Sequence, residues 1–307
     1  MDLPNVGRKN ICAPECPQGY TLKGSRCVKC QDRCPKECLG GKVYSIRSAE
    51  RYTGCTIING VIFIKIDGGI NIDEKLEKSL GAIEEVTDYI RIVKSYPILS
   101  LHFFKNLKVI HGSRLVDSNY SLVVIDNLNL QELFPPEISK NLVLKRGKAQ
   151  FQYNRKLCYS KIQSFLSDVG LVNRTNRDDY NPDLNGDSIP CAVTILNLEV
   201  HQVAEKEAIL RWQKFFLPDQ NMLFGYVVYY RKVETKNVDI FQGRDACSRS
   251  EWKKFEKDPE INNQSPEIIG IMYNLTAWTL YAAYVQPLIV GSAPKTAISN
   301  IVYFKTK

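Results

Sequence analysis

The distribution of cysteine constrains this chain more than any other feature of its sequence. Seven of the ten cysteines lie between Cys12 and Cys55, and the remaining three are Cys158, Cys191 and Cys247. A segment of 44 residues buries little apolar surface, so cross-links have to hold it together. The cysteine pattern therefore predicts a cross-linked stem at the N-terminal end, followed by domains that fold around ordinary hydrophobic cores.

Zinc is the alternative cross-link, because Cys27 and Cys30 have the spacing of half a zinc site. The other spacings in the cluster do not supply a matching second pair, and none of the three histidines lies near it in sequence. Disulfides are the preferred interpretation, and they imply an oxidising compartment. Residues 1–10 contain no apolar segment of the kind found in signal peptides, so we expect a chain that is truncated at its N-terminus.

Length and composition narrow the class of protein further. The chain has 307 residues, enough for two or three domains, and its 44% apolar and 24% charged residues are typical of globular proteins. The formal net charge is +8, and residues 1–55 alone contribute +5 of it. No basic-aromatic motif accompanies this excess, so nucleic acid is not an expected partner.

Short runs rich in Val, Ile, Phe or Tyr recur after Cys55, with Gly or Asn at the corners between them. These runs cover residues 56–66, 89–93, 107–110, 121–125, 142–145 and 149–153. Stacked turns of one strand each predict a parallel β-helix or a leucine-rich solenoid. An ordinary α/β sheet is the alternative, but most connections are too short for a crossover helix, and only residues 73–86 have a helical pattern.

A polar stretch at residues 172–190 contains several turn-forming pairs and predicts a mobile surface loop, closed by Cys191. It carries an acidic run that is the one candidate for a calcium site in the sequence. The run consists of Asp178, Asp179, Asp183 and Asp187. Because the EF-hand spacing and its terminal Glu are absent, we do not expect calcium or any other metal or cofactor.

Alternating strand patterns fill the C-terminal part of the chain and predict one β-sandwich. The expected strands cover residues 195–200, 207–212, 225–233, 252–255, 280–290 and 298–305. The uncharged stretch 268–294 is long enough to be considered as a membrane span. Its polar residues Asn274 and Thr276 would have unsatisfied groups in lipid, so a pair of sandwich strands is the preferred interpretation and no transmembrane segment is expected.

At this point an ordered set of motifs resembles the ectodomain of the insulin receptor and insulin-like growth factor receptor family. The motifs are Cys12-Ala-Pro-Glu-Cys16, Cys27-x-x-Cys30-x-x-x-Cys34-Pro-x-x-Cys38, Gly54-Cys55-Thr-Ile-Ile-Asn-Gly60, Leu80-Gly-x-Ile-Glu-Glu-Val86, Tyr89-Ile-Arg-Ile92, Ser100-Leu-x-Phe-Phe104, Phe151-x-Tyr-Asn154-x-Lys-Leu-Cys158, Leu210-Arg-Trp212 and Gly243-Arg-Asp-Ala-Cys247. The resemblance implies a mainly β chain in three parts. Residues 1–37 are expected to end a furin-like cysteine-rich region, 38–191 to form a right-handed β-helical receptor L domain, and 192–307 a fibronectin type III domain.

The resemblance also implies how the cysteines pair. The implied disulfides are Cys16–Cys27, Cys30–Cys34, Cys38–Cys55 and Cys158–Cys191. Cys12 matches a family cysteine whose partner lies further upstream, and Cys247 matches one that links two receptor halves into a homodimer. A free thiol at Cys247, or a bond between Cys247 and Cys12, is the alternative.

The function implied by the resemblance is binding of an insulin-like peptide outside the cell, by a receptor or a secreted decoy. A structural or adhesion module that binds no hormone is the alternative. No catalytic motif is visible, and the tyrosine kinase of the family has no counterpart in this chain. A carbohydrate-active β-helix would need paired carboxylates, for which Asp67, Glu84 and Glu85 are the candidates, and a solvated surface explains these residues better.

Two further sets of residues follow from the sequence. The Asn-x-Ser/Thr sequons, consistent with secretion and glycosylation, are at Asn119, Asn173, Asn263 and Asn274. By resemblance, the secondary hormone site on the fibronectin domain corresponds to Glu207, Ile209, Arg211, Asp258, Ile261 and Ile271. Glu207 stands where vertebrate receptors carry Lys, which reverses a charge. An exposed strand face without function is the alternative for this set.

Overall fold

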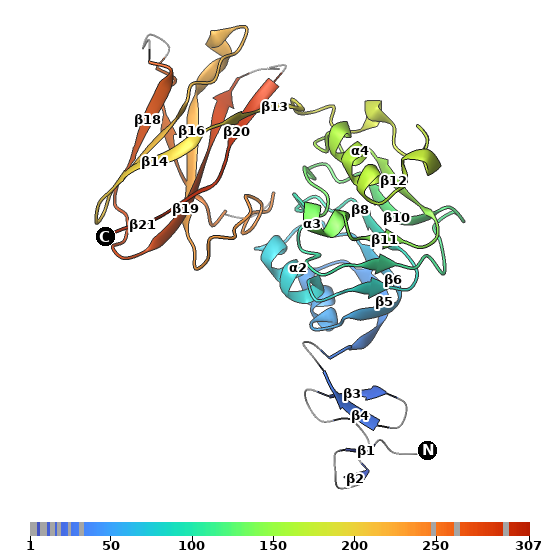
Figure 1. The fold of residues 1–307 in the computed structure, drawn as a ribbon. Coiled ribbons are helices and arrows are strands. Elements are labelled where there is room, and N and C mark those ends of the chain that lie inside the picture. Colours follow the sequence, from blue (N-terminus) through green and yellow to red (C-terminus); the bar gives the residue numbers. More distant parts are fainter. Residues whose placement is uncertain are drawn as a thin grey trace.

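The computed structural model describes residues 5–6, 11–12, 16, 20–23, 26–30, 34–246, 250–260, 265–290 and 295–307. The chain passes through a small stem, then a unit of parallel strands, and then a β-sandwich (Figure 1). We call the second part the parallel unit. Strands far outnumber helices, which confirms the mainly β prediction; the domain limits at residues 37 and 191 stay a prediction.

The stem consists of short strands held by disulfides. Its strands are β1 (Asn5–Val6), β2 (Ile11–Cys12), β3 (Tyr20–Lys23) and β4 (Arg26–Lys29), in the sheet order β2-β1-β4-β3. Disulfides join Cys16 to Cys27 on β4 and Cys30 to Cys34. These cysteines are therefore cross-linked to each other, and the stem does not use them as zinc ligands.

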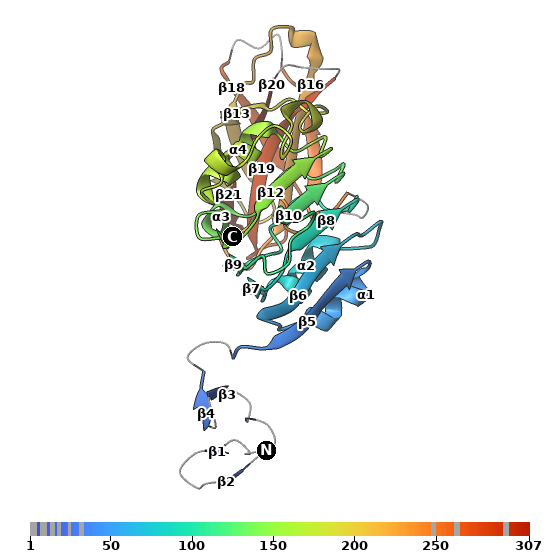
Figure 2. The ribbon, with the colours of Figure 1, turned by 90° about the vertical axis from the view of Figure 1, so that its right-hand side faces the viewer.

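The parallel unit winds the chain alternately between two ladders of strands. The strands are β5 (Glu37–Val43), β6 (Ile57–Ile64), β7 (Glu85–Val86), β8 (Ile90–Val93), β9 (Val109–Ile110), β10 (Tyr120–Ile125), β11 (Val143–Leu144) and β12 (Lys148–Gln152). One ladder is β5-β6-β8-β10-β12 and the other is β6-β7-β9-β11, with every pair parallel. Figure 2 shows the first ladder as a stack. Parallel ladders of this kind are compatible with a β-helix; the β-helix and its right-handed sense stay predictions.

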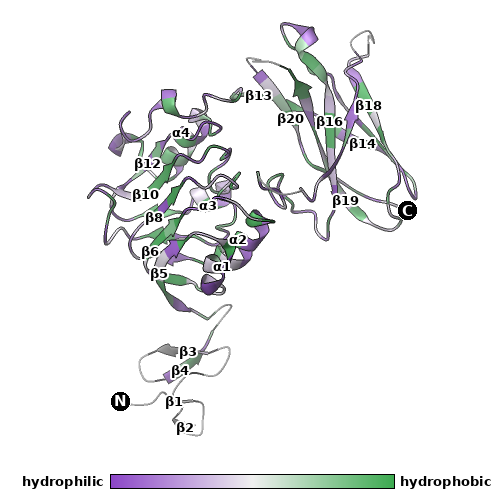
Figure 3. Ribbon diagram, turned by 180° about the vertical axis from the view of Figure 1, so that it is seen from behind, coloured by the Kyte–Doolittle hydropathy of each residue, from purple (hydrophilic) through white to green (hydrophobic). Residues whose placement is uncertain are grey.

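Apolar side chains from successive turns fill the interior of this unit. Ile64, Ile92, Val124 and Phe151 come from neighbouring strands of the first ladder and are fully buried. Helices close the core on its other sides, and hydrophobic residues follow the strands (Figure 3). They are α1 (Ile46–Ala49), α2 (Ile72–Leu80), α3 (Pro136–Ser139) and α4 (Tyr159–Asp168), with the 3₁₀ turns η1 (Glu50–Tyr52), η2 (Val172–Arg174) and η3 (Pro182–Leu184).

A spine of buried polar side chains runs along the corners that follow the strands. Ser95, Asn127, Asn154 and Asn185 are each at most 2% exposed. Each amide oxygen accepts from the backbone N–H of the preceding spine residue, at 3.0 Å for Ser95, 3.1 Å for Asn127 and 3.3 Å for Asn154. The spine therefore satisfies backbone groups that the turns leave without strand partners.

One prediction about this unit is wrong in its extent. The helix expected over 73–86 ends at Leu80, and Gly81 caps it by donating its N–H to the carbonyl of Glu77. The backbone N–H groups of Glu84 and Glu85 then donate to the carbonyl of Thr56, so this part of the chain joins the second ladder. The stretch 172–190 contains η2 and η3 and contributes buried Asn185 to the polar spine, and the mobility expected of it stays a prediction.

Acidic residues of that stretch serve the structure of the unit. The carboxylate of Asp179 is almost fully buried, accepts from the hydroxyl of Tyr120 at 2.8 Å and lies 3.3 Å from the Nζ of Lys148. Burial, followed by this hydrogen bond, raises the pKa of Tyr120 to about 12. In the described ranges, no three His, Cys, Asp or Glu side chains are grouped as a metal ion would require.

Two sheets and a short strand pair make up the sandwich. Its strands are β13 (Ala192–Leu196), β14 (Leu198–Val203), β15 (Ala208–Gln213), β16 (Leu223–Lys232), β17 (Lys253–Lys257), β18 (Glu267–Met272), β19 (Leu280–Ile289), β20 (Lys295–Ser299) and β21 (Val302–Lys305), with the 3₁₀ turn η4 (Gln220–Met222). The sheets are β14-β15-β18 and β17-β16-β19-β21, and β13 pairs with β20. Trp212 of the first sheet contacts Tyr226 of the second inside their shared core. Its assignment as a fibronectin type III domain stays a prediction.

Two of the expected sandwich strands are each divided in two. The run 195–200 is split between β13 and β14, and the run 298–305 between β20 and β21. Asn300 explains both breaks, because its side chain bonds the N–H of Leu198 at 2.9 Å and the carbonyl of Leu198 at 3.1 Å. The uncharged stretch supplies β18 and β19, and none of the helices in the described residues is long and apolar enough to span a membrane.

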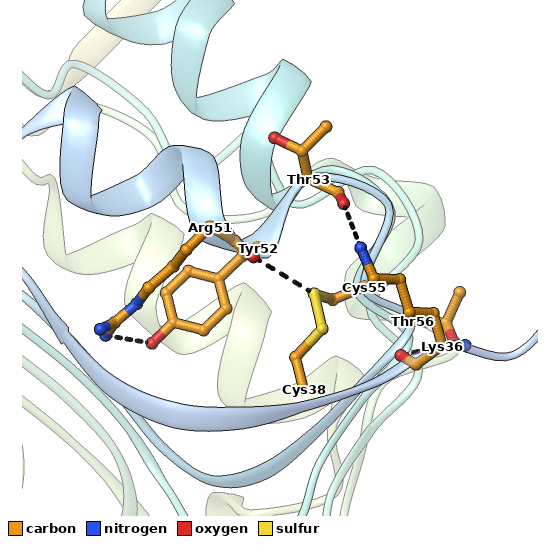
Figure 4. The surroundings of a disulfide bond; sticks show 7 residues. All are labelled: Lys36, Cys38, Arg51, Tyr52, Thr53, Cys55 and Thr56. Atoms are coloured by element: carbon orange, nitrogen blue, oxygen red, sulfur yellow. Dashed lines mark hydrogen bonds between the residues drawn. A yellow bond between two sulfur atoms is a disulfide. The ribbon is translucent and has the colours of Figure 1, made fainter.

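Two disulfides tie the parallel unit together at its ends. Cys38 on β5 is bonded to Cys55, which follows η1, so the first strand is fixed to the turn that leads into β6 (Figure 4). Cys158 at the start of α4 is bonded to Cys191, just before β13. Together with the two disulfides of the stem, these are the same four pairs that the resemblance implies.

Candidate functional site

The outer face of the sheet β14-β15-β18 carries an aliphatic cluster. On β15 the side chains of Ala208, Leu210 and Trp212 point into the core, so Ile209 and Arg211 lie on the outer face. Ile209 is directly opposite Ile271 of β18, and Arg211 is opposite Ile269. Ile269 and Ile271 are 51% and 39% exposed, and together with Ile209 they form a contiguous apolar patch, which is more informative than single exposed aliphatic side chains. We call Ile209, Ile269 and Ile271 the isoleucine patch.

Charged side chains border this patch on one side. The guanidinium of Arg211 lies 2.9 Å from a carboxylate oxygen of Glu199 on β14 and 3.4 Å from one of Glu267 on β18. The hydrogen bond with Glu199 raises the pKa of Arg211 above its usual value, so its charge is constant at all physiological pH values. The pairs fix the arginine across all three strands, and they leave the patch with an ordered polar border.

A shallow groove of about 730 Å³ continues the patch towards the other sheet. It lies between β17 and β18, which are edge strands of their sheets. Its apolar lining includes Ile269, Ile271 and Tyr273 from β18 and its end, together with Tyr230 and Phe255. Such a face, aliphatic at its centre and charged at its border, is suited to a small peptide or protein surface.

The predicted hormone-contact residues are only partly brought together. Ile209, Arg211 and Ile271 share the outer face. Glu207 is exposed and lies one residue before β15, at the turn at residues 204–207, so its place on the same face stays a prediction. Asp258 is exposed at the end of β17, on the edge of the other sheet, and Ile261 lies outside the described residues.

Sequence reasoning missed part of this site. Ile269, Glu199 and Glu267 were not singled out, although the alternation along β18 places Ile269 on the same face as Ile271. That alternation was a usable signal. The pairing of Arg211 with Glu199 and Glu267 was not readable, because it depends on the register between β14, β15 and β18.

The remaining predicted sites differ in how much the structure describes. The sequon residues Asn119, Asn173 and Asn274 are exposed, and Asn263 lies outside the described residues. Cys247 also lies outside them, and of Cys12 only the backbone position in β2 is described. Glycosylation and the interchain disulfide therefore stay predictions.

The acidic residues considered for carbohydrate chemistry are not grouped for catalysis. Glu84 forms an ion pair with Lys108 at 2.7 Å, and Glu85 bonds His111 at 2.7 Å. Asp67 is exposed. These pairings are those of a solvated surface, and they give the three carboxylates no shared position on the coil.

Comparison with known proteins shows where similar sequences occur. The sequence model of the receptor L domain family matches residues 54–169. The chain is 39% identical over 301 residues to the insulin-like peptide receptor of Branchiostoma lanceolatum, covering 96% of this chain and 22% of that protein. It is 35% identical over 317 residues to the insulin receptor of Xenopus laevis, covering 99% and 23%. It is 33% identical over 304 residues to the human insulin receptor-related protein, covering 96% and 23%. The chain thus spans less than a quarter of the length of these curated relatives.

Proposed function

Because the chain belongs to the insulin receptor and insulin-like growth factor receptor family, we propose that it is part of an extracellular receptor, or of a secreted decoy, for an insulin-like peptide. The match extends over nearly the whole chain and includes the stem, the parallel unit and the sandwich. Four disulfides, which are typical of oxidising compartments, support an extracellular location.

The isoleucine patch is the surface that we assign to the peptide. One observation carries this assignment: exposed Ile269 and Ile271 and half-buried Ile209 lie together across two paired strands, beside an arginine held by two carboxylates. Ile209, at the centre, has the geometry of a binding hot spot, because neighbouring side chains can exclude water around it once a partner covers the face.

Ile209→Asp tests the assignment by placing a carboxylate in the centre of the patch. We expect the affinity for insulin or an insulin-like growth factor to fall about tenfold or more, since burying an unpaired charge at a contact is costly. Surface plasmon resonance with the full chain immobilised and micromolar peptide in solution measures the change. Ile195→Asp is the matched control, because Ile195 lies on β13 of the same sandwich and is 60% exposed.

The outcomes separate the proposal from its alternative. Equal loss in both variants, or unchanged binding by Ile209→Asp, would show that the peptide contacts another surface. If the unmodified chain binds neither peptide, the adhesion module without hormone binding becomes the better account. Far-ultraviolet circular dichroism of both variants checks that the sandwich remains folded.

A covalent homodimer through Cys247 is a further part of the proposal. Residues just before Cys247 are anchored: Arg244 donates to the hydroxyl of Tyr284 at 2.6 Å, and the N–H of Ala246 donates to the carbonyl of Pro97 at 3.0 Å. We expect the secreted chain to run as a dimer on non-reducing gels and Cys247→Ser to run as a monomer. A monomeric unmodified chain would contradict this.

A further inference from the structure

A segment of the sandwich contacts the parallel unit through a small set of polar residues. Segment 239–246 reaches the start of α2 and the corner at residues 97–102 (Figure 1). Asp239 accepts a hydrogen bond from Nδ1 of His102, and the rings of His102 and Phe241 pack edge to face at 5.5 Å. Asp245 accepts from the backbone N–H of Ile72 at 3.0 Å. We call these contacts, together with Ala246–Pro97, the junction.

Asp245 caps a helix that belongs to the other unit. Ile72 is the first residue of α2, and Asn71 before it has φ 52° and provides no side-chain cap. A carboxylate at this position bonds a free N–H group and interacts favourably with the positive end of the helix dipole. The cap therefore contributes to the junction at any pH at which Asp245 is ionised.

The junction also brings like charges together. Asp73 on α2 is partly buried, and the carboxylates whose charge acts on it are Asp239 across the junction and Glu77 on its own helix. The opposing charges come from Lys105, which lies 3.4 Å from Glu77, and from His102 when it is protonated. The junction thus contains four carboxyl groups, with Asp245 at the helix start as the fourth, but only two basic side chains. The negative charge of an ionised Asp73 is therefore only partly balanced by positive charge.

Burial, then repulsion from Asp239 and Glu77, raises the pKa of Asp73 to about 7, despite the opposite effects of Lys105 and His102. Burial also raises the pKa of Asp239, but the bond and charge of His102 and the N–H of Phe241 lower it further, so its net pKa is below the usual value. Asp239 thus stays ionised and keeps its bond near neutral pH, whereas Asp73 takes up a proton.

From this arrangement we propose that the junction responds to protonation. Its closed state, in which the two units are in contact, is favoured below neutral pH, and its open state is favoured above it. When the units separate, Asp73 gains water and loses the repulsion of Asp239, while Glu77 stays on the same helix, so the pKa of Asp73 falls towards its usual value. The closed junction therefore binds the proton more tightly than the open one, and closure is favoured as pH falls. Between pH 8 and pH 6 the ratio of closed to open junction rises about tenfold.

Hydrogen exchange of the full chain measures this ratio directly. The N–H groups of Ile72 and Ala246 are bonded across the junction, so their exchange reports its opening. We expect about tenfold higher protection at pH 6 than at pH 8, with labelling times scaled to the intrinsic exchange rate at each pH. Peptides from β8 and β16 serve as references for global unfolding. Equal protection of the junction at both pH values in the unmodified chain overturns the proposal without any variant.

Three variants identify the group that carries the proton. Asp73→Asn mimics the protonated acid. In this variant we expect the junction N–H groups to be strongly protected from hydrogen exchange, to the same degree at pH 6 and at pH 8. Glu74→Gln alters the exposed neighbour on α2 and is expected to keep the tenfold change. Asp245→Asn weakens the cap, so it lowers protection at both pH values and keeps their ratio. A tenfold change that persists in Asp73→Asn assigns the proton to another residue and contradicts the proposal.

Discussion

Asn154→Ala is expected to lower the free energy of unfolding of the parallel unit by about 3 to 5 kcal/mol, because several buried groups lose a hydrogen-bond partner at about 1 to 3 kcal/mol each. The side chain of Asn154 is fully buried. Its Oδ1 accepts from the backbone N–H of Asn127 at 3.1 Å, and its Nδ2 donates to the carbonyl of Val124 at 2.9 Å and to Oδ1 of Asn185 at 3.1 Å. Alanine replaces none of these bonds.

Differential scanning calorimetry of the full chain checks this expectation, and the tryptophans provide an internal reference. All three, Trp212, Trp252 and Trp278, belong to the sandwich, so tryptophan emission follows that unit alone. Asn141→Ala is the matched control, because Asn141 is exposed and bonds only its local helix, at the carbonyl of Glu137. It should cost less than about 0.5 kcal/mol. A similarly small loss in Asn154→Ala would mean that the polar spine contributes little to stability.

Trp212→Ala is expected to destabilise the sandwich by about 3 to 5 kcal/mol, the usual cost of removing a large buried aromatic side chain. Trp212 is 1% exposed and packs edge to face on Tyr226, with ring centroids 5.6 Å apart. The ring also occupies the space beside Gly270, where a Cβ atom would lie 2.8 Å from it. Gly270 itself has no side chain that could fill the cavity.

Guanidinium denaturation followed by the emission of the remaining tryptophans measures this loss. Trp278→Ala is the control, since Trp278 is 77% exposed, and its free energy of unfolding should stay within about 0.5 kcal/mol of that of the unmodified chain. Trp212→Phe should lose less than Trp212→Ala. Phenylalanine keeps most of the ring and removes the Nε1–H of Trp212, which is buried without a partner in the described part of the chain. Equal losses in Trp212→Ala and Trp278→Ala would contradict the assigned core.

Local patterns in the sequence predicted the existence and approximate position of most strands. The runs predicted at 89–93 and 121–125 correspond to β8 and β10 within one residue, because buried parallel strands are short, continuous apolar segments. The predicted strand boundaries were wrong where a side chain distant in the sequence decides them. The break between β13 and β14 depends on Asn300, which is 102 positions from Leu198.

The sequence by itself determined the cross-linked stem, the mainly β character and, through its motifs, the family. It also placed Ile209 and Arg211 on one face, because alternation along a strand is a local property. Tertiary structure alone decided which strands lie beside β15, and therefore that Ile269 completes the patch and that Glu199 and Glu267 hold Arg211. It alone brought Asp73 to Asp239 and Asp245 to the start of α2. The physical reason is that charge repulsion, burial and helix capping depend on distances in space, and residues so far apart in sequence acquire those distances only when the units pack together.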